Sequence, residues 1–269
     1  MDNKIISEER KKYLRKIKAN KIAVVVTQIL ILVTFIVLWE MLANMKIINS
    51  FITSSPSRIA NTFMNMKNNN LMMHLGVTAY ETIIGFLAGT MIGVIVAILL
   101  WWSDFLSKVF EPFLVVLSSL PKTALGPIII IWVGAGTPAI IVMAIAISLI
   151  VTILDILNGF INTDKEKIKM AKSFSANKFQ ILTKIVIPSN ISTFINTLKV
   201  NIGLSLVGVI TGEFLVSKAG LGYLIVYGGQ VFQLDLVMTS VIILGAMAAI
   251  MYGSVSILEK AILRGRKLT

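Results

Sequence analysis

The sequence has no cysteine and a single histidine among its 269 residues. Disulfide bonds, thiol catalysis and cysteine-based metal sites are therefore excluded. One histidine cannot supply the ligands of a zinc site, so we expect no metal and no cofactor. His74 stands at the edge of an apolar run, where we expect it to act as an interfacial polar cap. No Ser/His/acid set and no Gly-x4-Gly-Lys-Ser/Thr phosphate loop can be assembled, so we do not expect an enzyme.

Charge is also scarce. Charged residues make up 14% of the chain and hydrophobic residues 56%, with a mean hydropathy of +0.87. A soluble globular protein has about 25% charged residues. The composition therefore predicts an all-α, polytopic membrane protein, embedded in lipid. The net charge of +12 arises from lysines at the flanks of the apolar runs, which is typical of membrane topology and does not call for a nucleic-acid partner.

Six apolar runs predict six transmembrane helices, since about 20 apolar residues cross the hydrocarbon layer. They cover residues 22–43, 75–100, 105–133, 139–160, 190–215 and 235–258. The first run is too long for the core of a signal peptide. Prolines at Pro112, Pro121 and Pro127 interrupt the third run, where we expect bends.

The expected organisation has four parts. A basic tail, 1–21, is followed by the first transmembrane helix with its outer connection, 22–69. The main membrane domain spans 70–260, and a short tail, 261–269, ends the chain. With six crossings, 19 Lys and Arg fall on the side of both termini and 4 on the other side. Positive charge is enriched on the cytoplasmic side, so both termini are expected in the cytoplasm of a cell-membrane protein.

Within the second run, Gly85, Gly89 and Gly93 recur every fourth residue and share one helix face. Such a stripe of small residues lets another helix approach closely, so we interpret it as a packing surface.

Charged residues inside the apolar runs are rare and costly, so each needs a partner, a cavity or a route to water. For Lys122, Lys199 and Glu213 we favour structural pairing or gating contacts, and we keep them as candidates for a translocation path. A second group of acids stands nearer the ends of the runs, where we expect them to reach water: Glu40, Glu81, Glu111 and Asp155.

The longest polar interval after the first hundred residues, 164–188, separates the fourth and fifth runs. We expect a helix over 165–179 within it. Met170 and Phe174 would share one side of that helix, with Ile181 in register. Lysines would occupy the other side, at Lys165, Lys169 and Lys172. An apolar helix face outside the membrane must be buried by lipid or by another protein.

This interval resembles the EAA loop of ABC importer permeases, which reads roughly E-A-A, three residues, G, nine residues, I-x-L-P. The corresponding residues here are Lys169, Met170, Ala171, Ser175, Ala176, Ile185, Ile187 and Pro188. Lys169 replaces the usual acid and Ser175 the usual glycine. The resemblance implies that this loop, with Phe174 on its apolar face, docks in a groove of an ATPase subunit.

Further residues are similar to the nitrate/sulfonate/taurine-type branch of these permeases. They are Gly85-Phe86, Gly89, Glu111-Pro112, Leu120-Pro121, Ala124-Leu125, Pro127, Trp132, Gly212-Glu213, Gly220 to Leu224 and Asp235. The resemblance implies a MetI-like (type I importer) fold in a permease subunit that carries a small anion, such as a sulfonate, taurine or nitrate, or a vitamin precursor. It also implies two ATPases, a second permease copy in a homodimer and an extracytoplasmic solute-binding protein. Ser118-Ser119 stand where many members have Arg-Pro, so no anion-binding arginine is expected there.

The alternative hypothesis is an ion-coupled carrier or channel that works alone. It would need buried acidic relays or an inverted repeat. The sequence has no internal repeat and few acids in the middle of a run. A membrane-embedded enzyme is weaker still, because no catalytic set of residues is present.

Overall fold

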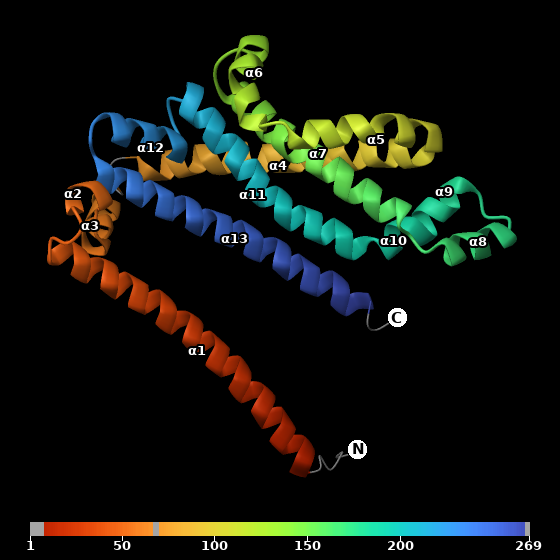
Figure 1. Ribbon diagram of the computed structural model, residues 1–269, viewed down its shortest axis with the longest axis horizontal. Helices are drawn as coiled ribbons and strands as arrows, with labels where there is room; N and C mark the ends of the chain where they lie inside the picture. The colour runs from red at the N-terminus through yellow and green to blue at the C-terminus, as the bar shows by residue number, and fades with distance from the viewer. Residues whose placement is uncertain (1–7, 67–69, 267–269) are drawn as a thin grey trace.

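The computed structural model describes residues 8–66 and 70–266, and helices joined by short turns account for nearly all of them (Figure 1). Within these ranges, five helices are long and apolar enough to cross a membrane, or six if one bent pair is a single span. The five are α1 (Glu8–Asn44), α4 (Leu71–Trp102), α7 (Thr137–Ile161), α11 (Ile191–Val216) and α13 (Leu234–Arg266). The prediction of an all-α membrane fold is confirmed.

The third apolar run forms the bent pair. Helix α5 (Asp104–Ser119) and the segment of η1 (Lys122–Leu125) and α6 (Gly126–Val133) meet at 89°. The break lies at Leu120–Pro121, because proline lacks a backbone N–H and forces the preceding residue into an extended conformation, here with ψ of 140° at Leu120. Pro112 lies inside α5 without ending it, and Pro127 occupies the first turn of α6, where proline is tolerated. Of the three prolines, only Pro121 coincides with a break between helices.

Helices α4, α7 and α11 form the centre of the bundle. The glycine stripe of α4 lies against α7, whose facing residues are Ala144, Ser148 and Thr152. A Cβ added at Gly85 would lie 2.5 Å from the Ala144 Cβ atom, and one added at Gly208 of α11 would lie 2.5 Å from the Ala144 Cα atom. Ala144 is thus enclosed between two glycines, and the three backbones approach closely because those glycines carry no side chain.

Helix α1 is the most exposed element. Ala43, near its carboxyl end, is the one buried residue among residues 10–44, and Figure 1 shows the helix running away from the other helices. It is held at its carboxyl end, where the Glu40 carboxylate accepts hydrogen bonds from the Ser57 N–H (3.0 Å) and hydroxyl (2.8 Å). Residues 8–21 of the expected tail continue this helix, while residues 1–7 lie outside the described part. So much bare apolar surface requires lipid or another subunit.

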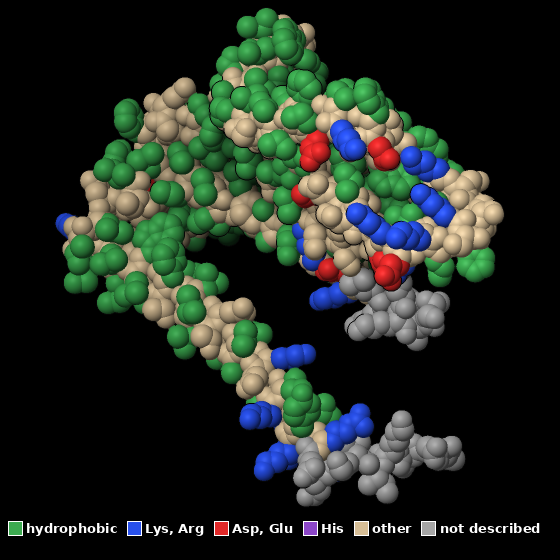
Figure 2. Space-filling model, turned by 45° about the vertical axis from the view of Figure 1, so that its right-hand side comes forward, with side chains coloured by type: hydrophobic (Ala, Val, Ile, Leu, Met, Phe, Trp, Pro, Cys, Tyr) green, Lys and Arg blue, Asp and Glu red, His purple; other side chains and the backbone are tan. Residues whose placement is uncertain are grey.

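The two ends of the molecule differ in charge. Figure 1 shows α8 (Lys165–Ser173), α9 (Lys178–Ile181), the start of α1 and the end of α13 at one end. The opposite end holds α2 (Ser50–Thr53), α3 (Pro56–Met66) and α12 (Leu221–Gln230). Lys and Arg side chains gather around the first end and on the start of α1, and much of the surface between is hydrophobic (Figure 2).

Candidate functional site: a projecting loop and a buried polar cluster

The polar interval between α7 and α11 forms a projecting loop, residues 164–188. Its first helix, α8, begins at Lys165 and is capped by Asp164, whose carboxylate accepts a hydrogen bond from the Glu166 N–H (2.9 Å). The helix ends at Ser173, so the helix expected over 165–179 was predicted six residues too long. Ser175 adopts a left-handed backbone with φ of 59°. The N–H of Ser175 bonds to the carbonyl of Lys172 (2.9 Å), and that of Ala176 to the carbonyl of Ala171 (3.0 Å).

These two hydrogen bonds define a Schellman turn, which normally has glycine at the left-handed position. Serine there accepts a steric cost that glycine does not have. The turn therefore keeps the backbone path that the glycine of the EAA loop would favour, although the residue differs.

The second half of the loop returns to the bundle. Asn177 and Gln180 form a reciprocal capping box at the start of α9. A π-helical turn, η2 (Leu182–Val186), and α10 (Ile187–Ser189) then lead into α11. Ile181 is buried in a cluster that includes Phe160 of α7, so the prediction that it shares a face with Met170 and Phe174 is wrong. The turn at Ser175 breaks the helical register that this prediction assumed.

Lys178 fastens the loop to the end of α4. Its ammonium group donates to the Trp102 carbonyl (2.7 Å) and lies over the Trp101 ring, 5.6 Å from the centroid. Ala171 is buried in the same apolar cluster, and Ile168, Ala176 and Ile185 pack against it. One side of the loop is therefore built into the bundle.

The other side of the loop presents bare apolar side chains. Phe174 is 80% exposed and Met170 is 59% exposed, and Phe179 in α9 is exposed as well. The sequence did not single out Phe179, although an aromatic residue just after a capping asparagine was a usable signal. Lys169 is exposed, and Pro188 is partly buried.

The three charged residues considered for a translocation path have different surroundings. Lys122 lies at the bend between α5 and α6, where its ammonium group donates to the Ser118 carbonyl (2.9 Å). Lys199 of α11 forms a salt bridge with Glu259 of α13 (2.7 Å). Glu213 is 1% exposed and lies inside the bundle. The structure therefore does not bring the three together.

Glu213 belongs to a buried polar cluster at the amino end of α12. Its carboxylate accepts hydrogen bonds from the Thr78 hydroxyl (2.6 Å) and the Gly222 N–H (2.5 Å). Thr78 also accepts from the Leu221 N–H (2.8 Å), and the His74 Nδ1 atom accepts from the Gly220 N–H (3.0 Å). Side chains of α4 and α11 thus satisfy the free N–H groups at the start of α12.

Two sequence predictions fail in this cluster. His74 is buried and stacks on Tyr223, so it is not an interfacial cap. Glu81, expected near water, is 0% exposed and lies beside Glu213. The cluster also explains the Gly220-Leu221-Gly222 run, because a side chain at either glycine would overlap the Glu213 carboxylate.

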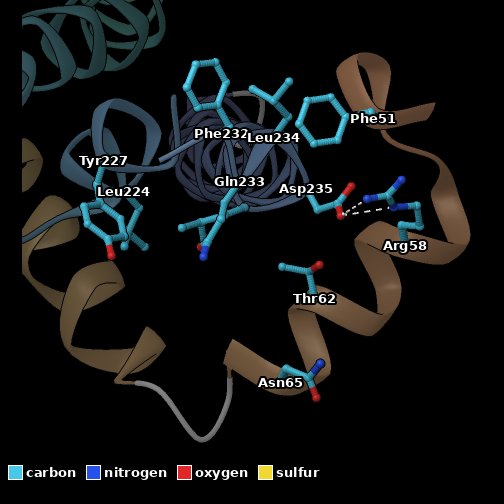
Figure 3. A pocket seen from close by; sticks show the side chains of 11 residues that line it. Phe51, Arg58, Thr62, Asn65, Leu224, Tyr227, Phe232, Gln233, Leu234 and Asp235 are labelled. Carbon is cyan, nitrogen blue, oxygen red and sulfur yellow. Dashed lines mark hydrogen bonds and ion pairs between the residues drawn. The ribbon is translucent and has the colours of Figure 1, made fainter. Parts of the chain in front are cut away.

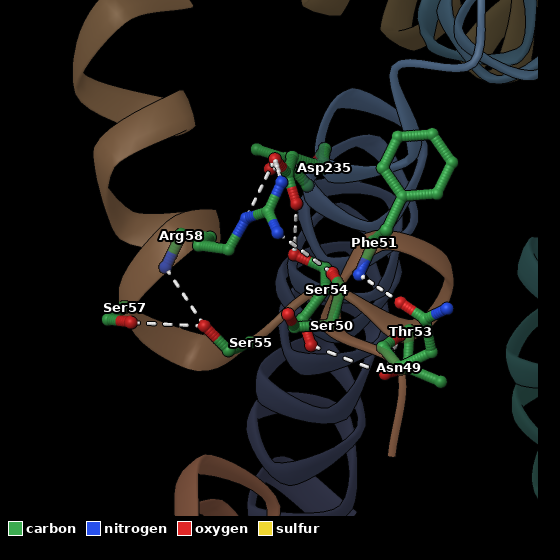
Figure 4. A network of polar contacts seen from close by, with 10 residues as sticks. Asn49, Ser50, Phe51, Thr53, Ser54, Ser55, Ser57, Arg58 and Asp235 are labelled. Atoms are coloured by element: carbon green, nitrogen blue, oxygen red, sulfur yellow. Dashed lines mark hydrogen bonds and ion pairs between the residues drawn. The ribbon is translucent and has the colours of Figure 1, made fainter. Parts of the chain in front are cut away.

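A cavity of about 570 Å³ opens beside α12, between α3 and the start of α13 (Figure 3). Arg58 lies at its edge and pairs with Asp235 (2.6 Å), which also accepts from the Ser54 hydroxyl (2.7 Å; Figure 4). The guanidinium group donates as well to the Ser50 carbonyl (3.0 Å). The Asp235 carboxylate therefore neutralises Arg58. Together these contacts hold α2 and α3 against α13.

The fold and these sites define a multi-pass helical membrane protein with a projecting loop that is fastened to the bundle on one side and bare on the other. Residues 89–267 match the family described as "Binding-protein-dependent transport system inner membrane component", and the chain belongs to this family. It is thus a permease, not an enzyme, and ATP hydrolysis in such a transporter takes place on a separate subunit. Family membership does not favour a carrier that works alone.

Named relatives agree with this assignment. A "Probable ABC transporter permease protein" of Haemophilus influenzae is 28% identical over 227 residues, covering 84% of this chain and 92% of the relative. The "Putative aliphatic sulfonates transport permease protein SsuC" of Bacillus subtilis is 23% identical, covering 86% and 84%. A solved structure of the MetNI methionine ABC transporter, in an inward-facing conformation, has a TM-score of 0.64 at 17% identity, covering 71% and 95%, and supports the MetI-like fold.

Proposed function

We propose that the chain forms the translocation path for a small solute, and that a separate ATPase drives it by docking on the projecting loop. The observation that carries this proposal is the exposure of Phe174 and Met170 at the end of the molecule where positive charge gathers. Burying a side chain of this size is worth about 1.5–3 kcal/mol. Two such neighbours can serve as the anchors of an interface.

The loop is also built to transmit a displacement. Ala171 and Ile181 belong to one buried cluster with Ala97 of α4 and Phe160 of α7. Close-packed interiors have low compressibility, so a push on Phe174 reaches both membrane-spanning helices. Lys169 occupies the position of the usual acid, so docking here would depend on the apolar anchors and not on a salt bridge from that position.

For the solute, we propose a small anion of the sulfonate, taurine or nitrate kind, or a vitamin precursor, delivered by a binding protein to a homodimer of this chain served by two ATPases. Similarity to the sulfonate permease named above supports the first class. Lys199 is neutralised by Glu259, and Arg58 by Asp235. Lys122 donates to the neutral Ser118 carbonyl, and this contact does not neutralise its positive charge. We therefore retain Lys122 as the residue of the translocation path.

The proposal is tested by the side of the membrane on which the loop lies. Because the chain has no native cysteine, a single introduced thiol can be labelled without background from other positions. Phe174→Cys and Phe232→Cys place single thiols at exposed positions, the first on the loop and the second at the cavity beside α12. In intact spheroplasts, a membrane-impermeant maleimide should label only Phe232→Cys. In inside-out vesicles it should label Phe174→Cys. Labelling of Phe174→Cys from outside would place the loop away from the ATPase and end the proposal.

A further inference from the structure

Glu81 of α4 and Glu213 of α11 are two acids buried side by side in the bundle. They are 0% and 1% exposed, and Thr137 at the start of α7 also lies beside Glu81. The neighbouring titratable groups are His74 and Tyr223, while Lys218 on the α11–α12 link is exposed. Within the described residues, neither carboxylate forms a salt bridge with a Lys or Arg. The pair is therefore not compensated by a cation.

The two carboxyl groups receive very different numbers of hydrogen bonds. Glu213 accepts from the Thr78 hydroxyl and the Gly222 N–H, and the Tyr223 N–H points to it as well. It also faces the amino end of α12, where the helix dipole stabilises negative charge. Both oxygens of Glu81 are buried and accept no well-formed hydrogen bond from the described residues.

Two adjacent carboxylates without a cation cannot both stay ionised in a buried site, because they repel and both lose hydration. The group with several donors keeps the negative charge, since an ionised carboxylate only accepts hydrogen bonds. Glu81 lacks such a set of donors, with only the Thr137 hydroxyl beside it, and is therefore better suited to be the acid, whose O–H can be given to its neighbour.

We propose that Glu81 and Glu213 share one proton, carried by Glu81, and that this pair latches the amino end of α12 onto α4 and α7. The pair then has a single negative charge, and the Glu81 O–H completes the donors around Glu213. Because α12 links α11 to α13, the latch fixes the outer ends of both helices relative to the centre of the bundle. Nothing in the proposed docking of an ATPase requires this arrangement.

Glutamine substitutions distinguish the two acids. In Glu81→Gln the amide can still donate to Glu213, so the unfolding temperature of the purified full-length chain should stay within about 2 °C of the parent. In Glu213→Gln one amide oxygen must replace two carboxylate oxygens, and the NH₂ group faces N–H donors. That variant should unfold about 5–10 °C lower. Hydrogen–deuterium exchange over residues 220–230 should rise in Glu213→Gln alone.

Infrared spectroscopy reports the proton directly. The parent should show a protonated-carboxyl band that shifts in D₂O, and Glu81→Gln should remove that component. Glu111→Gln, which changes an exposed acid on α5, should leave it in place. A band unaffected by Glu81→Gln, or equal destabilisation by the two glutamine variants, would overturn the proposal. The reverse order of stability would assign the proton to Glu213 and overturn it too.

Discussion

Replacing Met170 and Phe174 together by alanine is expected to weaken binding of the ATPase by about 100-fold or more, since two buried anchors contribute roughly 3–6 kcal/mol. Solute uptake should fall with it. Both side chains are exposed in the isolated chain, so their removal takes away contact area without opening a cavity in the bundle. Affinity titration of the purified permease with the ATPase encoded beside it, together with uptake in cells, measures both effects.

Two controls separate anchoring from a general change of the surface. Lys165→Ala removes a charge from the same helix and should change the affinity by less than about threefold, as expected for an exposed charge. Phe232→Ala removes another highly exposed aromatic side chain, at the opposite end of the molecule. It should leave ATPase binding unchanged. Equal losses from Phe174→Ala and Lys165→Ala would argue against a buried apolar anchor.

The second large effect is a loss of stability, expected when Gly208→Ala adds one methyl group at the centre of the bundle. In Gly208→Ala the new Cβ would meet the Ala144 Cα and N atoms at 2.5 and 2.9 Å. These are backbone atoms, which cannot move aside as a flexible side chain can. We expect a loss of about 3 kcal/mol and an unfolding temperature lower by about 6–12 °C, at the upper end for overpacking.

Gly203 offers a matched control on the same helix, because a Cβ there would meet nothing within 4 Å. Gly203→Ala should be neutral or raise stability by up to about 1 kcal/mol, since alanine is the better helix former. On α4, Gly85→Ala and Gly76→Ala form a second such pair. Thermal unfolding in detergent compares all four. If Gly203→Ala were as harmful as Gly208→Ala, the close approach of α7 and α11 would not be the cause.

The sequence predicted the helical membrane fold well, because lipid imposes a length and a composition on every crossing segment. Pattern alone could not decide which of three prolines bends the third run. Pro127 occupies the first turn of α6, where proline is tolerated, Pro112 lies inside α5 without ending it, and only Pro121 coincides with a break. The position of a break depends on the packing of the flanking segments, which is not written locally in the sequence.

The loop was predicted in part. The bare side chains of Met170 and Phe174 follow from their spacing, but the end of α8 depends on a serine in a conformation usually reserved for glycine. Ile181 was misplaced because the helical period was extended across that turn. The helical period predicts which residues share a face only within one continuous helix.

The buried cluster was missed because single residues were judged by their distance from the ends of a run. His74, Thr78 and Glu81 recur at intervals of four and three along α4, and this polar stripe was a signal for a buried partner. That partner, the Gly220–Gly222 turn, lies more than a hundred residues away in the chain. No local pattern identifies such a contact.

The docking of a separate ATPase on Phe174 is tested most directly by cross-linking from that position. A photoactivatable thiol reagent attached to Phe174→Cys, in membranes that contain the whole transporter, should join the permease to its ATPase on illumination. The same reagent on Phe232→Cys should yield no such adduct. Cross-links from Phe174→Cys to lipid alone, or to the binding protein, would contradict the account.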